Sequence, residues 1–381
     1  MSKFTLRTLR ASVYRYPLEQ EVRTSFGTMK DRPAVVVRAE DDSGTVGWGE
    51  AWCNFPTVGA EHRARLINDV CAPLLLQHAW PSAVEAYAAL TRKLHILALQ
   101  SAEPGPIAQA IAGVDTALWD LDSRRRDQPL YLALQEHFDG SPGPPVVSVP
   151  CYASGIHPQE ASVRIRQARQ SGFERFKVKV GFGADADLQA LRNLREEFGE
   201  ELPLMLDANQ RWSLAEAVTQ AVQLEAFRPI WLEEPMPADR PAEEWAQLAQ
   251  ATSTPLAAGE NLREAALEEA IQGGALRFVQ PDLAKWGGLS QGFLSGRQIL
   301  ASGKIYCPHY LGGGLGLLAS AHLLAAVGGP GWLEVDCNPN LLREQLAQPF
   351  PLTDHGQFAL PQHSGLGVTP DLSRLAPYQT L

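Results

Sequence analysis

The chain has 381 residues, 45% of them hydrophobic, and its 43 acidic and 33 basic residues give a formal net charge of -10. This length allows two or three domains, and the acidic balance argues against nucleic-acid binding, which needs a basic surface. No apolar run reaches the ~18 residues of a membrane span, and the N-terminus lacks a signal-peptide core, so we expect a cytoplasmic protein without membrane contact. Five widely spaced cysteines fit neither a disulfide scaffold nor a zinc ribbon.

The first 125 residues are predicted to form an α+β domain. Strands are expected over Phe4 to Tyr14, Ala34 to Ala39 and Thr45 to Glu50, with a turn at Asp42-Ser43-Gly44 before the third. Helical stretches follow, and the clearest one has apolar residues at helical spacing from Ile107 to Leu121. Strands followed by helices are typical of a compact α+β unit.

Beyond a Pro- and Gly-rich segment at 141–145, short strands alternate with helices. The expected strands are Val147–Tyr152, Arg175–Val180, Leu204–Asp207, Ile230–Glu233, Leu256–Ala258, Arg277–Gln280, Lys304–Cys307 and Trp332–Val335. One intervening helix has Ser213 as its N-cap and Glu216 to complete a capping box. The alternation over about 200 residues predicts a (β/α) barrel. A doubly wound sheet is the alternative, but its Gly-rich phosphate turn is poorly matched at 153–157. The tail is loop-like and is expected to pack on the first domain.

Polar residues stand at the ends of the predicted barrel strands. Lys177 and Lys179 share one face of their strand, because strand side chains alternate. Six later strand ends follow at intervals of 22 to 28 residues: Asp207, Glu233, Glu260, Asp282, His309 and Glu334. Any one of them is explained as well by a helix cap or a solvated edge. The consecutive pattern instead favours a site at the C-terminal mouth of the barrel, where barrel enzymes place their active sites.

Three of these residues suggest a metal site. Asp207, Glu233 and Glu260 cannot all remain ionised in a dry pocket without a positive partner. A hard divalent cation such as Mg²⁺ would supply that charge and accept oxygen ligands.

Two candidate bases flank the same position. Lys179 can act as a base near neutral pH only with a lowered pKa, which Lys177 and the cation would provide. His309 can act from the other side, with Asp282 orienting its ring. Glu334 would serve as a hydrogen-bond donor if it is protonated.

The ordered motifs resemble those of the enolase superfamily, in its mandelate racemase subgroup (the mandelate racemase/muconate lactonizing enzyme family). They are Lys177-Val178-Lys179, Asp207-Ala208-Asn209, 231–235, 259–261, 280–282, Pro308-His309, 332–334 and, in the first domain, 111–120. The resemblance spans nearly the whole chain. It implies a (β/α)7β modified TIM barrel with an N-terminal α+β capping domain completed by the C-terminal segment. The implied domains are 1–125 (cap), 146–345 (barrel) and 346–381 (C-terminal segment).

The resemblance also implies roles for single residues. One Mg²⁺ per active site would be held by Asp207, Glu233 and Glu260. The implied catalytic residues are Lys179, Lys177 at the substrate carboxylate, the Asp282–His309 dyad on the opposite face and Glu334 at the enolate, with Asn209 contacting the substrate. The muconate-lactonising type has a lysine in place of Asp282, and glucarate dehydratases have an asparagine in place of Glu260. Both differences favour the racemase-like arrangement.

The implied function is an enolase-superfamily lyase or isomerase that removes the proton α to a carboxylate through an ene-diolate stabilised by Mg²⁺, as is general for the superfamily. We expect dehydration of an acid sugar, an aldonate or aldarate. Cycloisomerisation of an aldarolactone is the first alternative, and racemisation or epimerisation of a 2-hydroxy acid is the second. The expected partner is a small-molecule carboxylate, and the protein is expected to be a homo-oligomer. Specificity should lie near 23–27 and 52–56, with 310–314 leaving open space beside His309 for a polyol chain.

Two hypotheses lie outside this family. Glu233 or Glu234 together with Glu260 would form the carboxylate pair of a retaining or inverting glycosidase, which does not depend on a metal. A non-catalytic, metal-bearing binding protein is disfavoured, because binding alone does not need two opposed bases.

Overall fold

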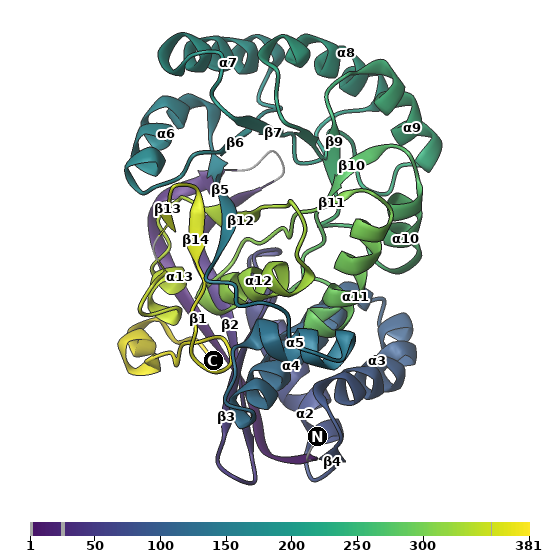
Figure 1. Cartoon of the computed structure of the whole chain (residues 1–381), viewed down its shortest axis with the longest axis vertical. Helices are drawn as coiled ribbons and strands as arrows, with labels where there is room; N and C mark the ends of the chain where they lie inside the picture. The colour runs from purple at the N-terminus through teal and green to yellow at the C-terminus, as the bar shows by residue number, and fades with distance from the viewer. Residues whose placement is uncertain (1–2, 24–26, 352) are drawn as a thin grey trace.

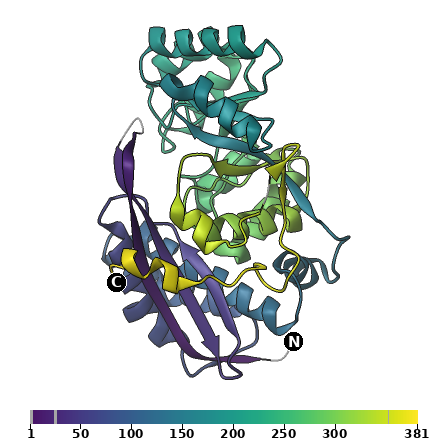
Figure 2. The ribbon, with the colours of Figure 1, turned by 90° about the vertical axis from the view of Figure 1, so that its left-hand side faces the viewer.

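The computed structural model describes residues 3–23, 27–351 and 353–381 of the chain. Its N-terminal part contains an antiparallel sheet in the order β3-β2-β1-β4. The strands are β1 (Phe4–Arg23), β2 (Thr28–Asp41), β3 (Val46–Ala51) and β4 (Ala79–Trp80). The first strand continues well beyond its predicted end at Tyr14. After a register shift between Pro17 and Val22, β1 stays paired with β2 as far as Arg23, and this end of the hairpin points toward the barrel (Figure 2).

Helices pack against this sheet or against one another on its side of the molecule. They are α1 (Gly59–Arg65), the π-helix η1 (Leu66–Cys71), α2 (Ala72–Leu75), α3 (Ala83–Gln100), α4 (Pro104–Arg125) and α5 (Leu130–Asp139). The helix predicted over 107–121 lies within α4, and its apolar residues are buried. Close packing of α4 on β3 depends on the absence of side chains, since a Cβ at Gly49 would lie 2.4 Å from the carbonyl oxygen of Gly113.

The second part of the chain is a parallel barrel, as predicted. Its strands are β5 (Ser148–Ile156), β6 (Phe176–Lys179), β7 (Leu204–Asp207), β8 (Leu232–Glu233), β9 (Leu256–Ala258), β10 (Leu276–Val279), β11 (Ile305–Tyr306) and β12 (Leu333–Asp336). Within the described ranges, parallel pairing runs in chain order from β5 to β11, and β12 pairs with β5.

Helices alternate with these strands and surround them (Figure 1). They are α6 (Ala161–Gln170), α7 (Ala184–Phe198), α8 (Leu214–Leu224), α9 (Ala242–Ala251), α10 (Glu264–Gln272), α11 (Gly288–Ala301) and α12 (Gly314–Val327). Short 3₁₀ turns, η2 (Pro158–Glu160) and η3 (Glu225–Phe227), lie next to α6 and α8. The capping box of Ser213 and Glu216 at the start of α8 is confirmed. The strand and helix order gives the (β/α)7β fold.

Alternation along the strands separates the two faces of the barrel wall. The base of the interior is filled by a cluster distinct from the main core: Tyr152, Met205, Trp231, Ala257, Phe278 and Cys307, with Ile230, Ile305 and Trp332 beside them. The Trp231 ring stacks on that of Trp332, with centroids 5.9 Å apart. Glu233 comes two residues after Trp231, so their side chains point to the same face. The polar strand ends therefore lie above this cluster, which forms an aromatic floor.

The chain returns to the N-terminal sheet at its end. This segment contains α13 (Leu341–Leu346), β13 (Thr353–Asp354), β14 (Gln357–Ala359) and the 3₁₀ helix η4 (Leu372–Tyr378). Strand β14 adds antiparallel to β5. The amide of Thr380 then donates to the carbonyl of Val13 at 2.9 Å, and the C-terminus lies over the purple sheet in Figure 2. The domain boundaries given above stay a prediction. No helix in the described ranges is long and apolar enough to cross a membrane.

Candidate active site

A cavity of about 200 Å³ lies between the N-terminal sheet and the C-terminal ends of the barrel strands. Its wall contains six of the residues predicted from the sequence: Lys179, Asp207, Asn209, Glu260, His309 and Glu334. The other three predicted residues lie next to the wall. Lys177 contacts Glu334, Asp282 contacts His309, and Glu233 contacts Lys177. The structure therefore brings all nine into one connected group.

Lys177 lies at the centre of the group, directly above the aromatic floor. Its side chain is 3% exposed, and its Nζ lies 2.6 Å from Glu233 Oε1 and 2.7 Å from Glu334 Oε1. Burial alone would lower the pKa of Lys177, but the two carboxylates outweigh it and raise that pKa well above its usual value. Lys177 is therefore a fixed positive charge.

Glu233 is held from three directions. Besides Lys177, Trp231 Nε1 donates to it at 3.0 Å and Gln280 Nε2 at 2.7 Å. Burial raises the pKa of Glu233 to about 7, and the Asp207 carboxylate acts in the same direction against the effect of Lys177. Negative charge is thus crowded on this side of the barrel.

Lys179 stands one pleat further out on β6. Its Nζ donates to Asn209 Oδ1 at 2.6 Å, and Asn209 in turn donates from its backbone amide and its Nδ2 to Asp207, at 2.8 and 3.0 Å. The backbone of Asn209 has a φ of 45°, and that of Gln210 a φ of 62°. Such left-handed conformations are costly outside glycine and concentrate at functional sites.

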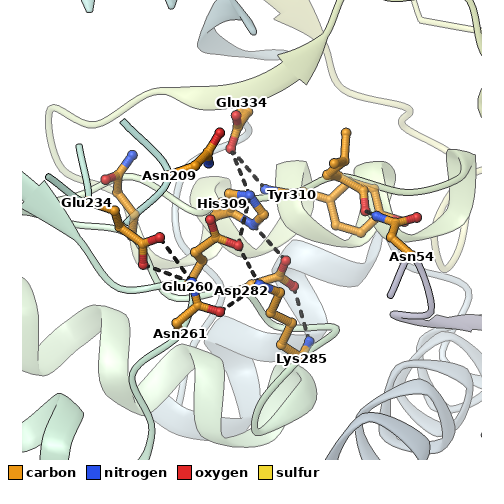
Figure 3. Close-up of polar contacts among 12 residues, drawn as sticks. Asn54, Asn209, Glu234, Glu260, Asn261, Asp282, Lys285, His309, Tyr310 and Glu334 are labelled. Atoms are coloured by element: carbon orange, nitrogen blue, oxygen red, sulfur yellow. Dashed lines mark hydrogen bonds and ion pairs between the residues drawn. The ribbon is translucent and has the colours of Figure 1, made fainter. Parts of the chain in front are cut away.

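His309 lines the cavity from the segment that follows β11, and Figure 3 shows its contacts with neighbouring carboxylates. Its Nδ1 lies 2.7 Å from Asp282 Oδ2, and its Nε2 lies 3.4 Å from Glu260 Oε2 and 3.8 Å from Glu334 Oε2. Burial alone would lower the pKa of His309, but Glu260, Glu334 and Asp282 together raise it to about 9.

The state of Glu334 differs from the sequence-based expectation of a protonated donor. Burial would raise the pKa of Glu334, but Lys177 and His309 lower it below the usual value. Ser154 Oγ and the amide of Tyr310 both donate to this carboxylate. Glu334 is therefore an ionised acceptor here, because two cations flank it.

Three further cavity residues, Glu234, Asn261 and Lys285, have no role assigned by the family resemblance, and Glu234 has one only in the glycosidase hypothesis (Figure 3). Lys285 Nζ pairs with Glu260 and donates to Asn261 Oδ1 at 3.1 Å, while Asn261 Nδ2 donates to both carboxylate oxygens of Glu234 at 3.0 Å. Burial and the Glu260 charge raise the pKa of Glu234 well above its usual value. Trp52 of the N-terminal part covers Lys285, with Nζ 4.8 Å from the ring centroid.

The sequence gives only weak signals that Glu234 and Lys285 face the cavity. Glu234 follows Glu233 directly, and alternation alone would have turned it away from the cavity. Its φ of 37° reverses that direction. Lys285 comes three residues after Asp282 in a segment with no strand pattern, so sequence spacing did not place it.

The expectation of open space at 310–314 is wrong for the glycines of this segment, although Leu311 lines the cavity together with His309. A Cβ at Gly312 would lie 2.4 Å from the Tyr310 hydroxyl, and one at Gly313 would lie 2.6 Å from Glu50 Oε1. The buried Glu50 carboxylate accepts hydrogen bonds from the amides of Gly313 and Gly316. These glycines let the loop pack against β3, which fixes the segment after His309. Of the predicted specificity loops, residues 24–26 lie outside the described residues, while Trp52 and Phe55 are in the cavity wall.

The candidate metal ligands match Mg²⁺ in donor type. Asp207, Glu233 and Glu260 offer oxygen only, as hard cations prefer, and their crowded charge calls for a positive partner. Across the described part of the chain, no three His, Cys, Asp or Glu side chains stand close enough together to hold an ion as they are. The carboxylate oxygens of the three candidate ligands instead accept hydrogen bonds from Asn209, Lys177 and Lys285, respectively. The residues fit a divalent cation in charge and chemistry, and coordination requires these side chains to turn.

Comparison with known proteins places this geometry in a family. The N-terminal domain of mandelate racemase/muconate lactonizing enzyme matches residues 8–134, and the enolase C-terminal domain-like family matches residues 160–374. A crystal structure of a mandelate racemase/muconate lactonizing enzyme from Bordetella bronchiseptica RB50 is 48% identical, covers 99% of this chain and 100% of its own, and has a TM-score of 0.90.

Two characterised relatives are similar over much of the chain. L-talarate/galactarate dehydratase of Salmonella typhimurium is 38% identical over 70% of this chain and 64% of the relative. A crystal structure of this dehydratase, with Mg and L-lyxarohydroxamate bound, covers 100% of this chain and 93% of its own at 26% identity, with a TM-score of 0.85. The 3,6-anhydro-alpha-L-galactonate cycloisomerase of Streptomyces coelicolor is 30% identical over 97% of this chain and 98% of the relative.

A capped barrel whose relatives are acid-sugar dehydratases and cycloisomerases defines an enzyme of the lyase or isomerase class. The chain belongs to the enolase superfamily, in its mandelate racemase and muconate lactonizing enzyme family. The resemblance and the fold predicted from the motifs are thereby confirmed.

Proposed function

We propose that this enzyme removes the proton α to a carboxylate of an acid sugar, an aldonate or aldarate, and completes the reaction by expelling the β-hydroxyl as water. The observation that carries the proposal is the placement of two opposed basic groups across one small cavity. Lys179 stands on β6, and His309, bonded to Asp282 at 2.7 Å, follows β11. A substrate between them can lose a proton on one face and receive one on the other.

The proposal includes one Mg²⁺ in the site. Asp207, Glu233 and Glu260 would hold it, and relatives of this fold bind magnesium. When bound, the ion would neutralise the negative charge that develops on the substrate carboxylate as the α-proton leaves.

The side chains divide the remaining work. Lys177 contributes a fixed charge at the substrate carboxylate, and Asn209 orients Lys179 and contacts the substrate. One member of the Lys179/His309 pair takes the α-proton, so that the C–H electrons form the ene-diolate. The other member gives a proton to the departing β-hydroxyl, which breaks the C–O bond and releases water. Asp282 orients the His309 ring through its hydrogen bond to Nδ1, and Glu334 lies beside the ring, where it would contact the enolate.

The test is exchange of the α-proton in deuterated solvent across a library of aldonates and aldarates. We expect Lys179→Ala and His309→Asn each to lower turnover by at least about 10²-fold, the scale of general acid–base catalysis. One of the two should retain exchange, because only the second proton transfer is lost. The exposed residues Lys93 and His363 provide matched controls, Lys93→Ala and His363→Asn, which should retain full activity. Normal turnover in both site variants would refute the two-base proposal.

Metal dependence separates this proposal from the glycosidase alternative. Removal of divalent ions with EDTA should abolish proton exchange, and Mg²⁺ should restore it. A glycosidase acting through Glu233 or Glu234 with Glu260 would survive EDTA and hydrolyse glycosides. Tight binding of acid sugars without turnover of any of them would instead support the non-catalytic binding protein.

Cycloisomerisation is the second candidate reaction, favoured by the cycloisomerase relative that matches nearly the whole chain. It uses the same residues, and mass spectrometry of the product separates it from dehydration, because dehydration lowers the mass of the substrate by one water whereas cycloisomerisation leaves the mass unchanged. Racemisation would return deuterium to the α-carbon with inversion and no other change. The homo-oligomeric state and the cytoplasmic location stay predictions.

A further inference from the structure

A buried ion pair joins the N-terminal sheet to the last barrel strand inside the cavity wall. Arg32 lies on β2 and Asp336 at the end of β12, and Arg32 Nη2 is 2.8 Å from Asp336 Oδ2. Their side chains are 2% and 6% exposed, and both residues line the cavity. Neither residue takes part in the chemistry proposed above.

Strand order places this pair opposite the crowded carboxylates. In the ring of eight, β12 stands four strands from β8, which carries Glu233, and its partner β5 stands four strands from β9, which precedes Glu260. The cavity therefore has two opposite poles, one at Glu233 and Glu260 and the other at Arg32 and Asp336. Lys179 on β6 and His309 after β11 flank the line between these two poles. A substrate whose reacting carboxylate lies near Glu233 and Glu260 must therefore extend between the two bases toward Arg32 and Asp336.

The Arg32–Asp336 ion pair at the second pole has no net charge. Asp336 Oδ2 accepts from Arg32, and Asp336 Oδ1 accepts from the amide and the Nδ2 of Asn338 at 3.1 and 2.8 Å. Arg32 Nε has no hydrogen-bond partner among the described residues, so the guanidinium is not saturated with acceptors. Donor and acceptor groups stand side by side here, which matches a hydroxyl, since a hydroxyl both donates and accepts.

The charge balance of the whole wall points the same way. Among its described lining residues, five carboxyl groups face Arg32, Lys179 and Lys285, and the charged form of His309 adds a fourth cation. A divalent cation would then leave a small positive excess, which the reacting carboxylate of the substrate would neutralise, so that none remains for a second carboxylate. An uncompensated buried charge is costly, so a diacid would bind poorly.

The cavity as a whole is small. Its volume of about 200 Å³ is below the ~300–1,000 Å³ of drug-sized sites. The apolar side chains of Val22, Met29 and Phe55 line the cavity together with Arg32 and Asp336. A hydroxyl-bearing chain end fits these surroundings, because its carbon can contact the apolar groups while its oxygen meets the ion pair.

We infer that the Arg32–Asp336 pair receives the substrate end remote from the reacting carboxylate and selects a hydroxyl there over a second carboxylate. The inference rests on the proposed function and narrows its substrate class to polyhydroxy monocarboxylates. Arg32 and Asp336 are specificity-determining residues in this scheme, and neither moves a proton.

The experiment compares kcat/KM for aldonates and aldarates matched in carbon number and configuration. The wild-type enzyme should favour the monoacid at least about 10-fold. Asp336→Asn leaves the Arg32 charge uncompensated and should shift the monoacid-to-diacid ratio toward the diacid about 10-fold. Arg32→Gln leaves the Asp336 charge and should shift the ratio in the opposite direction. Arg15 forms ion pairs in the same sheet outside the cavity wall, so Arg15→Gln should leave the ratio unchanged.

Opposite shifts cannot arise from a folding defect, which would lower both activities together, and thermal unfolding of each variant checks this directly. An active wild-type enzyme that prefers the diacid refutes the inference alone. Equal shifts in the two variants, or none, also refute it. Failure to exchange the α-proton of any acid of either class refutes the proposed function, and the inference falls with it.

Discussion

Replacement of Asp115 tests how much the hydrogen bonds between α4 of the N-terminal part and α11 of the barrel contribute to stability. Asp115 on α4 is 1% exposed, and it accepts hydrogen bonds from the amide of Ser290 at 2.9 Å and from its hydroxyl at 2.7 Å, at the start of α11. Trp119 Nε1 donates to the same hydroxyl at 2.9 Å. Burial, opposed by the Ser290 bonds, raises the pKa of Asp115 from 3.8 to about 7.

The sign of the effect follows from that direction. The folded protein binds the Asp115 proton more tightly than the unfolded chain does, so its contribution to stability is full at low pH and falls as the pH rises from about 4 to 7. At about 1.4 kcal/mol per tenfold change in proton affinity, the loss between pH 5 and pH 8 is about 3 kcal/mol. Asp115→Asn has no such titration, so its stability relative to wild type should increase by that amount over this interval.

Urea unfolding of both proteins at pH 5 and pH 8 measures the difference. The exposed Asp185 provides the control, since Asp185→Asn should follow the wild-type profile. Asp115→Ala should be less stable than Asp115→Asn by about 2 kcal/mol at both pH values, because the Ser290 amide and hydroxyl lose their acceptor. Parallel profiles for wild type and Asp115→Asn would show that burial does not bias the protonation of this carboxyl.

Three further predictions concern other buried positions. At Gly288, φ is +59° and a Cβ would lie 2.4 Å from Asp115 Oδ2, so Gly288→Ala should lower the free energy of unfolding by about 1–3 kcal/mol. Gly303→Ala should lower it less, because φ is +77° there but no atom lies within 4 Å of the added Cβ. Burial lowers the pKa of His322 to about 4, so the wild type should lose up to about 3 kcal/mol of stability as the pH falls from 6.5 to 4. His322→Gln should remove this loss, which thermal unfolding at the two pH values measures. Glu50→Ala frees the loop that follows His309, so steady-state kinetics should show kcat falling about 10-fold or more with KM changed less; an unchanged kcat would refute this positioning role.

Sequence reasoning reached the barrel and the inward side chains because both depend on local rules. Lys177 and Lys179 share a face by alternation alone, and parallel strands bring their carboxyl ends to one rim. The prediction failed where contacts join distant segments. Nothing near Arg32 indicates its partner, which lies 304 residues away. The sequence also predicts too short a first strand, because the outer half of β1 shows no apolar alternation. That Glu234 faces the cavity beside Glu233 could not be predicted, because a left-handed backbone, which the sequence does not reveal, sets its direction.

The rings of Tyr152, Trp231 and Phe278 beneath the polar strand ends determine how substrate, product and water can reach the cavity. Together with the other residues of this layer they fill the barrel interior below the cavity, whereas Val22 of β1 and Met29 of β2 line the cavity itself. Substrate, product and exchanging water therefore do not cross the barrel interior and must reach the cavity from the side of the N-terminal sheet. Loosening the hairpin should therefore speed product escape and solvent exchange together, while leaving the reacting groups where they are.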